Sequence, residues 1–244
     1  MDINFFKKIR ILDGGMGQEI LARGMKPNGT LWSANALLQK KYHQLLLDTH
    51  LDFIKAGAEV IVTTTFTTRK IRLRDNCVED HFEYLNIKAG EIAQKAKKIY
   101  PKTLIAGGLP PQNLTYEADT RYDEEIRENF YSQAKILNPY VDFFYLDVLS
   151  SVRECKIAIK CIEEFNKPYL IGAHISEGTN LPSDEKISEI VTKINHKKLL
   201  GIILSCISPE NFELNINELK SLDIPFGFKL NGFIRTKVKP NYTG

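Results

Sequence analysis

Short apolar runs alternate with longer stretches of helical period along this chain, and no other feature constrains the fold as strongly. The apolar runs are nearly continuous, as strands covered on both faces of a parallel sheet are. Seven candidate strands lie at 10–13, 60–66, 103–107, 142–147, 168–173, 199–205 and 224–230. Candidate helices lie between them at 35–56, 79–99, 123–138, 150–166, 183–196 and 209–221. The pattern predicts an α/β fold of the (β/α)8 TIM-barrel type, incomplete at the C-terminus, with about seven βα units present.

Length and composition agree with one soluble barrel. The 244 residues are enough for one domain over 1–244, and 43% apolar with 26% charged residues excludes a disordered chain. The 33 basic and 30 acidic residues are mixed along the chain, so no surface for nucleic acid or an anionic membrane is expected. No segment is apolar for long enough to span a bilayer, and the start lacks the order of a signal peptide. We therefore predict a cytoplasmic protein with no nucleic-acid or membrane partner.

The four cysteines predict neither disulfides nor a zinc ribbon. Cys77, Cys155, Cys161 and Cys206 are irregularly spaced, and no CxxC pair is present. Cys155 and Cys161 lie on an amphipathic helical pattern, so both are expected to be small buried residues.

Polar residues gather where the candidate strands end. Two long connections, 14–34 and 108–122, also follow strands, and (β/α) barrels keep their sites at that end of the sheet. The residues expected to converge on one mouth are Asp13 with Gly14 and Gly15, Thr63 to Thr65, Gly107 and Gly108, Asp147, His174 with Ser176, Cys206, and Asn231 with Gly232.

Six motifs together resemble the homocysteine S-methyltransferase family, in the family's order and across nearly the whole chain. They are ILDGGMGQEILARG, LWSANAL, HLDFIKAGAEVIVTTTF, IAGGLPP followed by Tyr116, the acid ending DFFYLD, and SCISPE. The resemblance implies a zinc-dependent barrel that methylates the thiol of homocysteine to give methionine.

The resemblance also implies roles for particular residues. The DGG turn would place Asp13 and Gly14 against the amino acid substrate, Asp147 would bind its ammonium group, and Cys206 would be the first zinc ligand. No catalytic residue is expected beyond the metal site.

The sequence departs from the family pattern at several of these positions. The family usually has Glu at the position of Asp147 and Asn at those of Ser205 and Thr64. It also closes with a GGCC turn that supplies two more thiolates, and neither precedes Gly244. The zinc site is therefore expected to be incomplete in this chain.

Each of these residues has a plainer interpretation. Asp13 could shape a turn, Asp147 could cap the following helix, and Cys206 alone would be a small buried residue. His174 could replace a zinc thiolate, although a structural histidine is the commoner case. The aromatic rings of Trp32, Phe66 and Tyr116 could face a cationic donor, and for Trp32 and Phe66 core packing is an equal alternative.

Three functions follow from these observations. The first is methyl transfer to homocysteine from a small cationic donor such as S-methylmethionine, S-adenosylmethionine or a betaine. The second is a catalytically silent barrel that keeps an amino acid pocket and acts as a binding or partner subunit. The third, an unrelated barrel enzyme such as an aldolase or phosphate-binding isomerase, is disfavoured because we expect neither a Gly-rich phosphate loop nor a Schiff-base lysine at a strand end.

Seven strands leave two sheet edges to be covered. The edges at 10–13 and 224–230 would need the tail at 230–244, a second copy in a homo-oligomer, or a complementing fragment.

Overall fold

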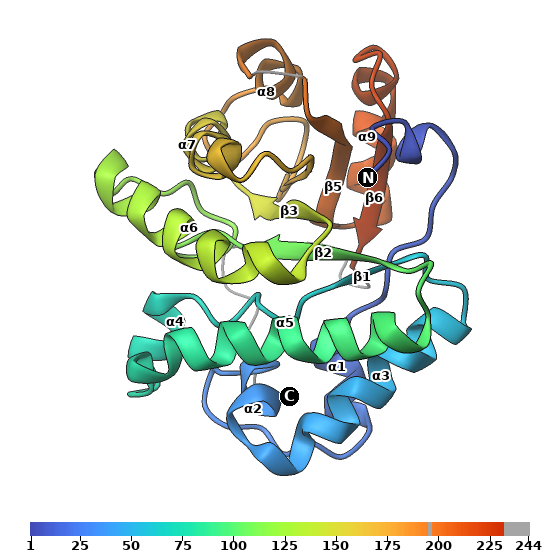
Figure 1. The fold of residues 1–244 in the computed structure, drawn as a ribbon. Coiled ribbons are helices and arrows are strands. Elements are labelled where there is room, and N and C mark those ends of the chain that lie inside the picture. Colours follow the sequence, from blue (N-terminus) through green and yellow to red (C-terminus); the bar gives the residue numbers. More distant parts are fainter. Residues whose placement is uncertain (195–196, 232–244) are drawn as a thin grey trace. The chain divides into compact units, whose positions relative to one another are not determined.

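Parallel strands follow one another in chain order through the computed structural model, which describes residues 1–194 and 197–231 (Figure 1). The pairs β1/β2, β4/β5 and β5/β6 are all parallel. The six strands assigned in this part of the chain are β1 Val60–Val62, β2 Leu104–Leu109, β3 Phe143–Leu149, β4 Tyr169–Ala173, β5 Leu199–Ile207 and β6 Phe226–Leu230.

Helices separate the strands, which confirms the predicted α/β class as an incomplete (β/α)8 type. They are α1 Met16–Ala22, α2 Ala34–Leu38, α3 His43–Lys55, α4 Lys70–Arg74, α5 Phe82–Ile99, α6 Asp123–Leu137, α7 Val152–Ile162, α8 Ile187–Lys193 and α9 Pro209–Lys220. The first predicted strand, 10–13, is reduced to a single parallel bridge between Leu12 and Val60.

The chain forms two compact units, which are described separately. Unit 1 comprises Met1–Lys8, Pro111–Phe130 and Tyr145–Gly244, and unit 2 comprises Ile9–Pro110 and Tyr131–Phe144. One domain over 1–244 stays a prediction.

The core of unit 2 lies among its helices. The long helix α5 packs against α2 and α3, and α1 packs against α3 (Figure 1). The buried side chains that fill this helical layer include Ile20, Leu37, Leu46, Leu73 and Leu85. Their apolar faces are what keeps these helices in place.

In unit 1 the strands β4, β5 and β6 lie side by side, and α9 packs on β5 and β6. Strand β6 exposes alternate apolar side chains, with Phe228 58% exposed although its ring centroid lies 4.8 Å from that of Phe212 in α9. The intervening residues of β6, Gly227 and Lys229, face the opposite side of the strand. One set of β6 side chains is therefore free to line a site.

Local signals place most helix ends correctly. The Ser208 hydroxyl caps α9 by accepting from the backbone N–H of Asn211, with Pro209 at the first helical position. Gly57, with a φ of 113°, follows the end of α3 as predicted. Helix α8 is the exception, because it begins at Ile187 after Lys186 and not at the predicted Ser183. His196 and Gly232, and the tail from 232 onward, lie outside the described residues.

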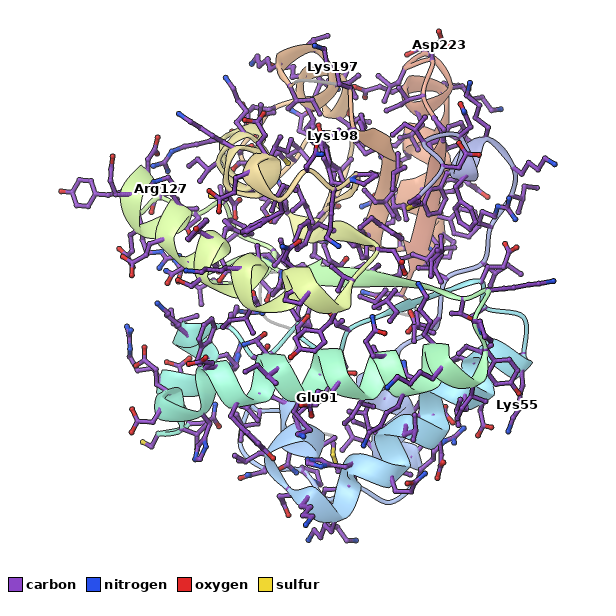
Figure 2. All side chains as sticks on the ribbon, viewed as in Figure 1. Lys55, Glu91, Arg127, Lys197, Lys198 and Asp223 are labelled. Carbon is purple, nitrogen blue, oxygen red and sulfur yellow. The ribbon has the colours of Figure 1, made fainter. Side chains whose placement is uncertain are left out.

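Charged side chains are spread over both units. In Figure 2, Lys55 of unit 2 and Arg127 and Asp223 of unit 1 extend away from the ribbon, and all three are exposed. No helix within the described residues is both long and apolar enough to cross a membrane.

Candidate active site

The site in unit 1 is built around an ion pair at strand ends. Asp147, near the end of β3, holds the Lys229 ammonium of β6 with Nζ 2.6 Å from each of its carboxylate oxygens. The Asp147 side chain is only 9% exposed, whereas that of Lys229 is 39% exposed. Burial opposes the charge of Lys229, but the neighbouring Asp147 carboxylate more than offsets it and the pKa of Lys229 lies well above its usual value. Lys229 is therefore protonated at neutral pH.

Lys229 was not singled out by the sequence analysis. This lysine lies near the end of β6, and we expected no Schiff-base lysine at a strand end. It stays protonated in the ion pair, so it is no Schiff-base nucleophile, which needs a neutral amine.

Cys206 enters the site through a β-bulge. Along β5 and β6, Ser205 pairs with Lys229 and Ile207 with Leu230, which leaves Cys206 as the extra residue, with a φ of 59°. Such bulges redirect a side chain beside a site. Burial raises the pKa of the Cys206 thiol, against the effect of the Lys229 ammonium, so this thiol is protonated at neutral pH.

His174 is a fully paired, neutral histidine. Its Nδ1 lies 3.1 Å from the backbone carbonyl of Ser205, and its Nε2 lies 2.9 Å from the Ser176 hydroxyl. Because a carbonyl only accepts, Nδ1 carries the proton and Nε2 accepts from Ser176. Burial lowers the pKa of His174 to about 4. These contacts favour the structural interpretation of His174 over a metal ligand.

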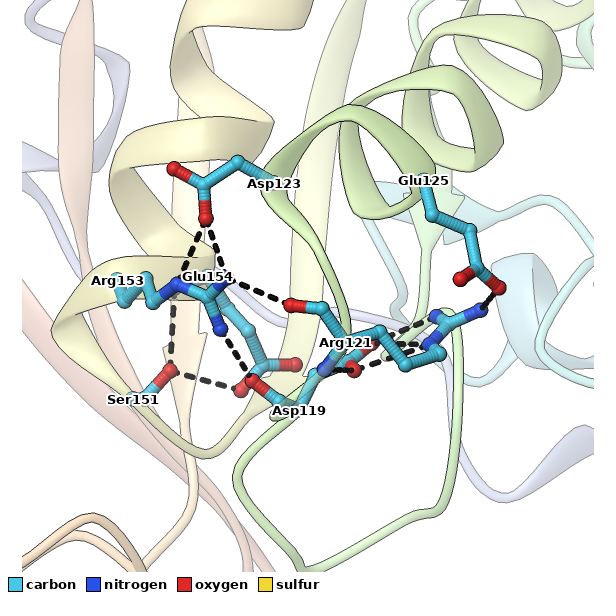
Figure 3. Close-up of polar contacts among 7 residues, drawn as sticks. All are labelled: Asp119, Arg121, Asp123, Glu125, Ser151, Arg153 and Glu154. Atoms are coloured by element: carbon cyan, nitrogen blue, oxygen red, sulfur yellow. Dashed lines mark hydrogen bonds and ion pairs between the residues drawn. The ribbon is translucent and has the colours of Figure 1, made fainter.

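A fastened loop brings Tyr116 to the same site. The Tyr116 ring centroid lies 4.4 Å from that of His174, and Tyr116 has a φ of 71°. Farther along the loop, Arg121 pairs with Asp119, and Arg153 of α7 donates to the backbone carbonyl of Asp119 at 2.8 Å (Figure 3). Tyr116 is therefore held by a loop whose far end is fixed to α7.

The helix α7 starts with a buried acid beside that loop. Ser151 caps the helix, and its hydroxyl lies 3.0 Å from Oε2 of Glu154 (Figure 3). Burial raises the pKa of Glu154 to about 7, and the nearby Asp119 carboxylate adds to the rise.

In unit 2 the Asp13 side chain turns inward. Its Oδ2 accepts from the backbone N–H of Val62 at 2.9 Å and lies 3.8 Å from Nδ1 of the buried His50. Burial lowers the pKa of His50 to about 4, so the ring is neutral at neutral pH. Asp13 thus fastens its turn to β1, and the exposed backbone at Gly14 is the part of this turn open to a ligand.

The aromatic candidates of unit 2 have partners within the chain. Trp32 and Phe66 meet edge to face with centroids 6.4 Å apart, and the Arg69 guanidinium lies 5.4 Å from the Phe66 ring centroid. The adjoining loop is held by Thr68, whose hydroxyl donates to the side-chain oxygen of the buried Asn86 at 2.7 Å. Facing a cationic donor stays a prediction for these rings.

The structure thus gathers Asp147, His174 and Cys206 in unit 1, while Asp13 and Gly14 belong to unit 2. Sequence reasoning missed Lys229. It also missed Tyr145, whose ring centroid lies 5.4 Å from the Lys229 Nζ atom. The one available signal for Lys229 was a lone cation in the run IPFGFKL, which we interpreted only as a strand.

A metal does not fit the described residues by themselves. Across 1–194 and 197–231, no three His, Cys, Asp or Glu side chains are grouped closely enough to hold an ion. We therefore derive no step through zinc, and Cys206 as a zinc ligand stays a prediction.

The family model for homocysteine S-methyltransferase matches residues 10–243. Homocysteine S-methyltransferase YbgG of Bacillus subtilis is 22% identical over 236 residues, covering 86% of this chain and 73% of that protein. Homocysteine S-methyltransferase of Escherichia coli is 23% identical over 240 residues, covering 88% and 75%.

The fold is also similar to a solved structure. The metallated homocysteine methyltransferase MmuM from Escherichia coli superposes with a TM-score of 0.77 at 18% identity, over 93% of each chain. Since the family model spans nearly the whole sequence, this chain belongs to the homocysteine S-methyltransferase family.

Proposed function

We propose that this chain transfers a methyl group from a small cationic donor to the thiol of homocysteine, giving methionine. Membership of the family supports the reaction, as do the names of the relatives in Bacillus subtilis and Escherichia coli. The observation that carries the proposal to this chain's own residues is the nearly buried Asp147 carboxylate at a strand end beside the Cys206 bulge. An acid in that position suits the ammonium group of an amino acid.

The chemistry is a displacement at the donor's methyl carbon. The homocysteine thiol first loses its proton to water, and a lone pair of the resulting thiolate forms the new S–CH3 bond. The donor's bond to that methyl breaks, and its electron pair stays on the donor sulfur or nitrogen, which becomes neutral. An anionic sulfur and a cationic donor neutralise each other as the methyl moves, so a site shielded from water favours the transition state.

The residues take distinct roles in this proposal. In unit 1, Asp147 binds the substrate ammonium. Substrate contacts at Asp13 and Gly14, which belong to unit 2, stay predictions. The ring of Tyr116 offers a face to the cationic donor. S-methylmethionine, S-adenosylmethionine and a betaine are the donors to compare. A cytoplasmic location and a partner on the sheet edges stay predictions.

Methionine formation tests the proposal directly. Purified protein is incubated with homocysteine and each donor in turn, and the product is measured by mass spectrometry. Asp147→Asn is expected to lower kcat/KM about 10- to 100-fold, because one charge-assisted contact is lost. The exposed Asp223, whose φ of 51° Asn also tolerates, supplies the control Asp223→Asn, which should leave kcat/KM unchanged.

Two outcomes would count against the proposal. Homocysteine binding without methionine from any donor would favour the silent barrel instead. Equal activity of Asp147→Asn and wild type would show that Asp147 does not bind the substrate.

Zinc content, measured in wild type and Cys206→Ser, tests the metal separately, since equal zinc in both would exclude Cys206 as a ligand.

A further inference from the structure

The acid assigned to the ligand's ammonium already holds an ammonium of the chain itself. Lys229 Nζ lies 2.6 Å from both oxygens of Asp147, which is the geometry a bound amino group would adopt. The Nζ atom also lies 5.4 Å from the ring centroid of Tyr145. Any amino acid that binds Asp147 must therefore either displace the Lys229 ammonium or bind beside it.

The charges of a ligand determine whether it can bind Asp147 while Lys229 is present. A ligand with only an ammonium group would bring a second positive charge against a pair that is already neutral. If it displaced Lys229, the lysine would lose its ion pair with Asp147. A zwitterion instead brings a carboxylate for Lys229 together with an ammonium for Asp147, so that each of the four charges has an opposite neighbour.

We propose that Asp147 and Lys229 are the two halves of a clamp for an α-amino acid zwitterion. Asp147 takes the ammonium group, Lys229 takes the carboxylate, and without a ligand the two halves neutralise each other. This inference rests on the proposed function for the role of Asp147, and it adds Lys229 as the residue that selects for a carboxylate.

The two halves differ in burial in the way a clamp requires. Asp147 is nearly buried on β3, and the next residue, Val148, has a φ of 65°, a conformation that holds only when the surroundings enforce it. Lys229 is more than a third exposed and has a flexible four-carbon stem. The lysine can therefore rotate to a carboxylate while the aspartate stays in place.

The neighbouring titratable groups do not compete for the ligand's charges. His174 is neutral at neutral pH because burial lowers its pKa to about 4. Tyr145, whose pKa burial raises, stays a neutral phenol. Among the described residues that act electrostatically on Lys229, Asp147 is therefore the charged one.

Removing one charge from the ligand tests the clamp without altering the protein. Calorimetry compares L-homocysteine with 3-aminopropane-1-thiol, which lacks the carboxylate, and with 4-sulfanylbutanoate, which lacks the ammonium. We expect each truncated ligand to bind wild type about 10- to 100-fold more weakly than homocysteine.

Variants then assign the carboxylate contact to Lys229. In Lys229→Met the preference for homocysteine over 3-aminopropane-1-thiol should fall to about threefold or less, and Lys229→Arg should retain it. Lys193→Met is the matched control, because Lys193 forms an exposed ion pair with Glu189 at 2.6 Å and should keep the wild-type preference. Lys229→Arg and the ligand series keep the test valid if Lys229→Met is poorly folded.

Three results would overturn the clamp. Tighter binding of homocysteine to Lys229→Met would make Lys229 a competitor for Asp147. An unchanged preference in Lys229→Met would place the carboxylate elsewhere. No binding of homocysteine, methionine or 2-aminobutyrate to wild type at about 10 mM would exclude a zwitterion site. A Lys229-dependent preference without methionine formation would leave the clamp standing and reject only the proposed function.

Discussion

The hydroxyl groups of Tyr145 and Ser205 lie 2.7 Å apart, joining β3 to β5 across the intervening strand β4. Both side chains are almost completely buried, with Tyr145 1% and Ser205 0% exposed. The same two strands carry Asp147 and Cys206, so this hydrogen bond fixes the spacing of the site. It also places a polar pair in an otherwise apolar layer, where a single unpaired hydroxyl would be costly.

The Tyr145–Ser205 pair should show strong coupling. Ser205→Ala or Tyr145→Phe alone is expected to lower the free energy of unfolding by about 1–3 kcal/mol, because each leaves a buried hydroxyl without its partner. The double variant should lose less free energy of unfolding than the two single variants together, with a coupling energy of about 1 kcal/mol. Urea unfolding of all four proteins measures it, and Ser221→Ala, which alters an exposed hydroxyl, is the control. Additive losses would show that the pair is not a unit.

Gly172 is the residue that lets these two hydroxyls meet. A Cβ added at Gly172 would lie 2.6 Å from Ser205 Oγ and 2.9 Å from the Tyr145 ring. Gly172→Ala should therefore cost about 1–3 kcal/mol by overpacking. A Cβ at Gly227 in β6 would meet its nearest atom, in Ile203, at 3.6 Å, so Gly227→Ala is the matched strand control. Equal unfolding midpoints for the two variants would contradict this account.

The sequence predicted much of this site, because its signals are local. Alternation of apolar runs and helical stretches located β2 to β6 and therefore the ends of β3, β4 and β5. Asp147, His174 and Cys206 follow directly from those ends, since parallel strands bring their carboxyl ends to one edge. The buried Cys155 and Cys161 were likewise expected from helical periodicity.

What the sequence could not supply depends on register and on non-local contacts. The partnership of Lys229 with Asp147 requires the β5/β6 register, and a bulge at Cys206 shifts that register by one residue. The inward turn of Asp13 depends on the Val62 amide, 49 residues away. The short helix α1 lies within 14–34, where we expected only a long connection.

The glycines of the GGMG run should respond differently to substitution. A Cβ at Gly17 in α1 would lie 2.2 Å from the Trp32 indole, whereas one at Gly15 would meet nothing within 4 Å. Alanine favours helix formation over glycine by about 1 kcal/mol, so a helix effect alone would stabilise Gly17→Ala. We expect the clash to dominate and the unfolding midpoint to fall, while Gly15→Ala changes little. A stabilised Gly17→Ala would mean that Trp32 is loosely held and free to face a ligand.

Glu154 should make stability depend on pH. Burial raises its folded-state pKa to about 7 from the ordinary 4.5, so between these values the folded protein holds a proton that the unfolded chain has released. The free energy of unfolding must then fall as pH rises through this window, by roughly 3 kcal/mol for this group alone. Glu154→Gln has no titrating carboxyl group, so this part of the pH dependence of the free energy of unfolding should be absent.

The comparison that isolates this effect is the difference between Glu154→Gln and wild type at pH 5 and at pH 8. Titration of His50 and His174, whose lowered pKa values make stability fall as pH drops from about 6.5 to 4, is common to both proteins and cancels. The free energy of unfolding of Glu154→Gln should increase relative to that of wild type as pH rises from 5 to 8. Glu189 is the control acid, because its hydrogen bond with Lys193 lowers its pKa and Glu189→Gln should show no such gain. An identical difference at both pH values would mean that Glu154 is already ionised in the folded protein.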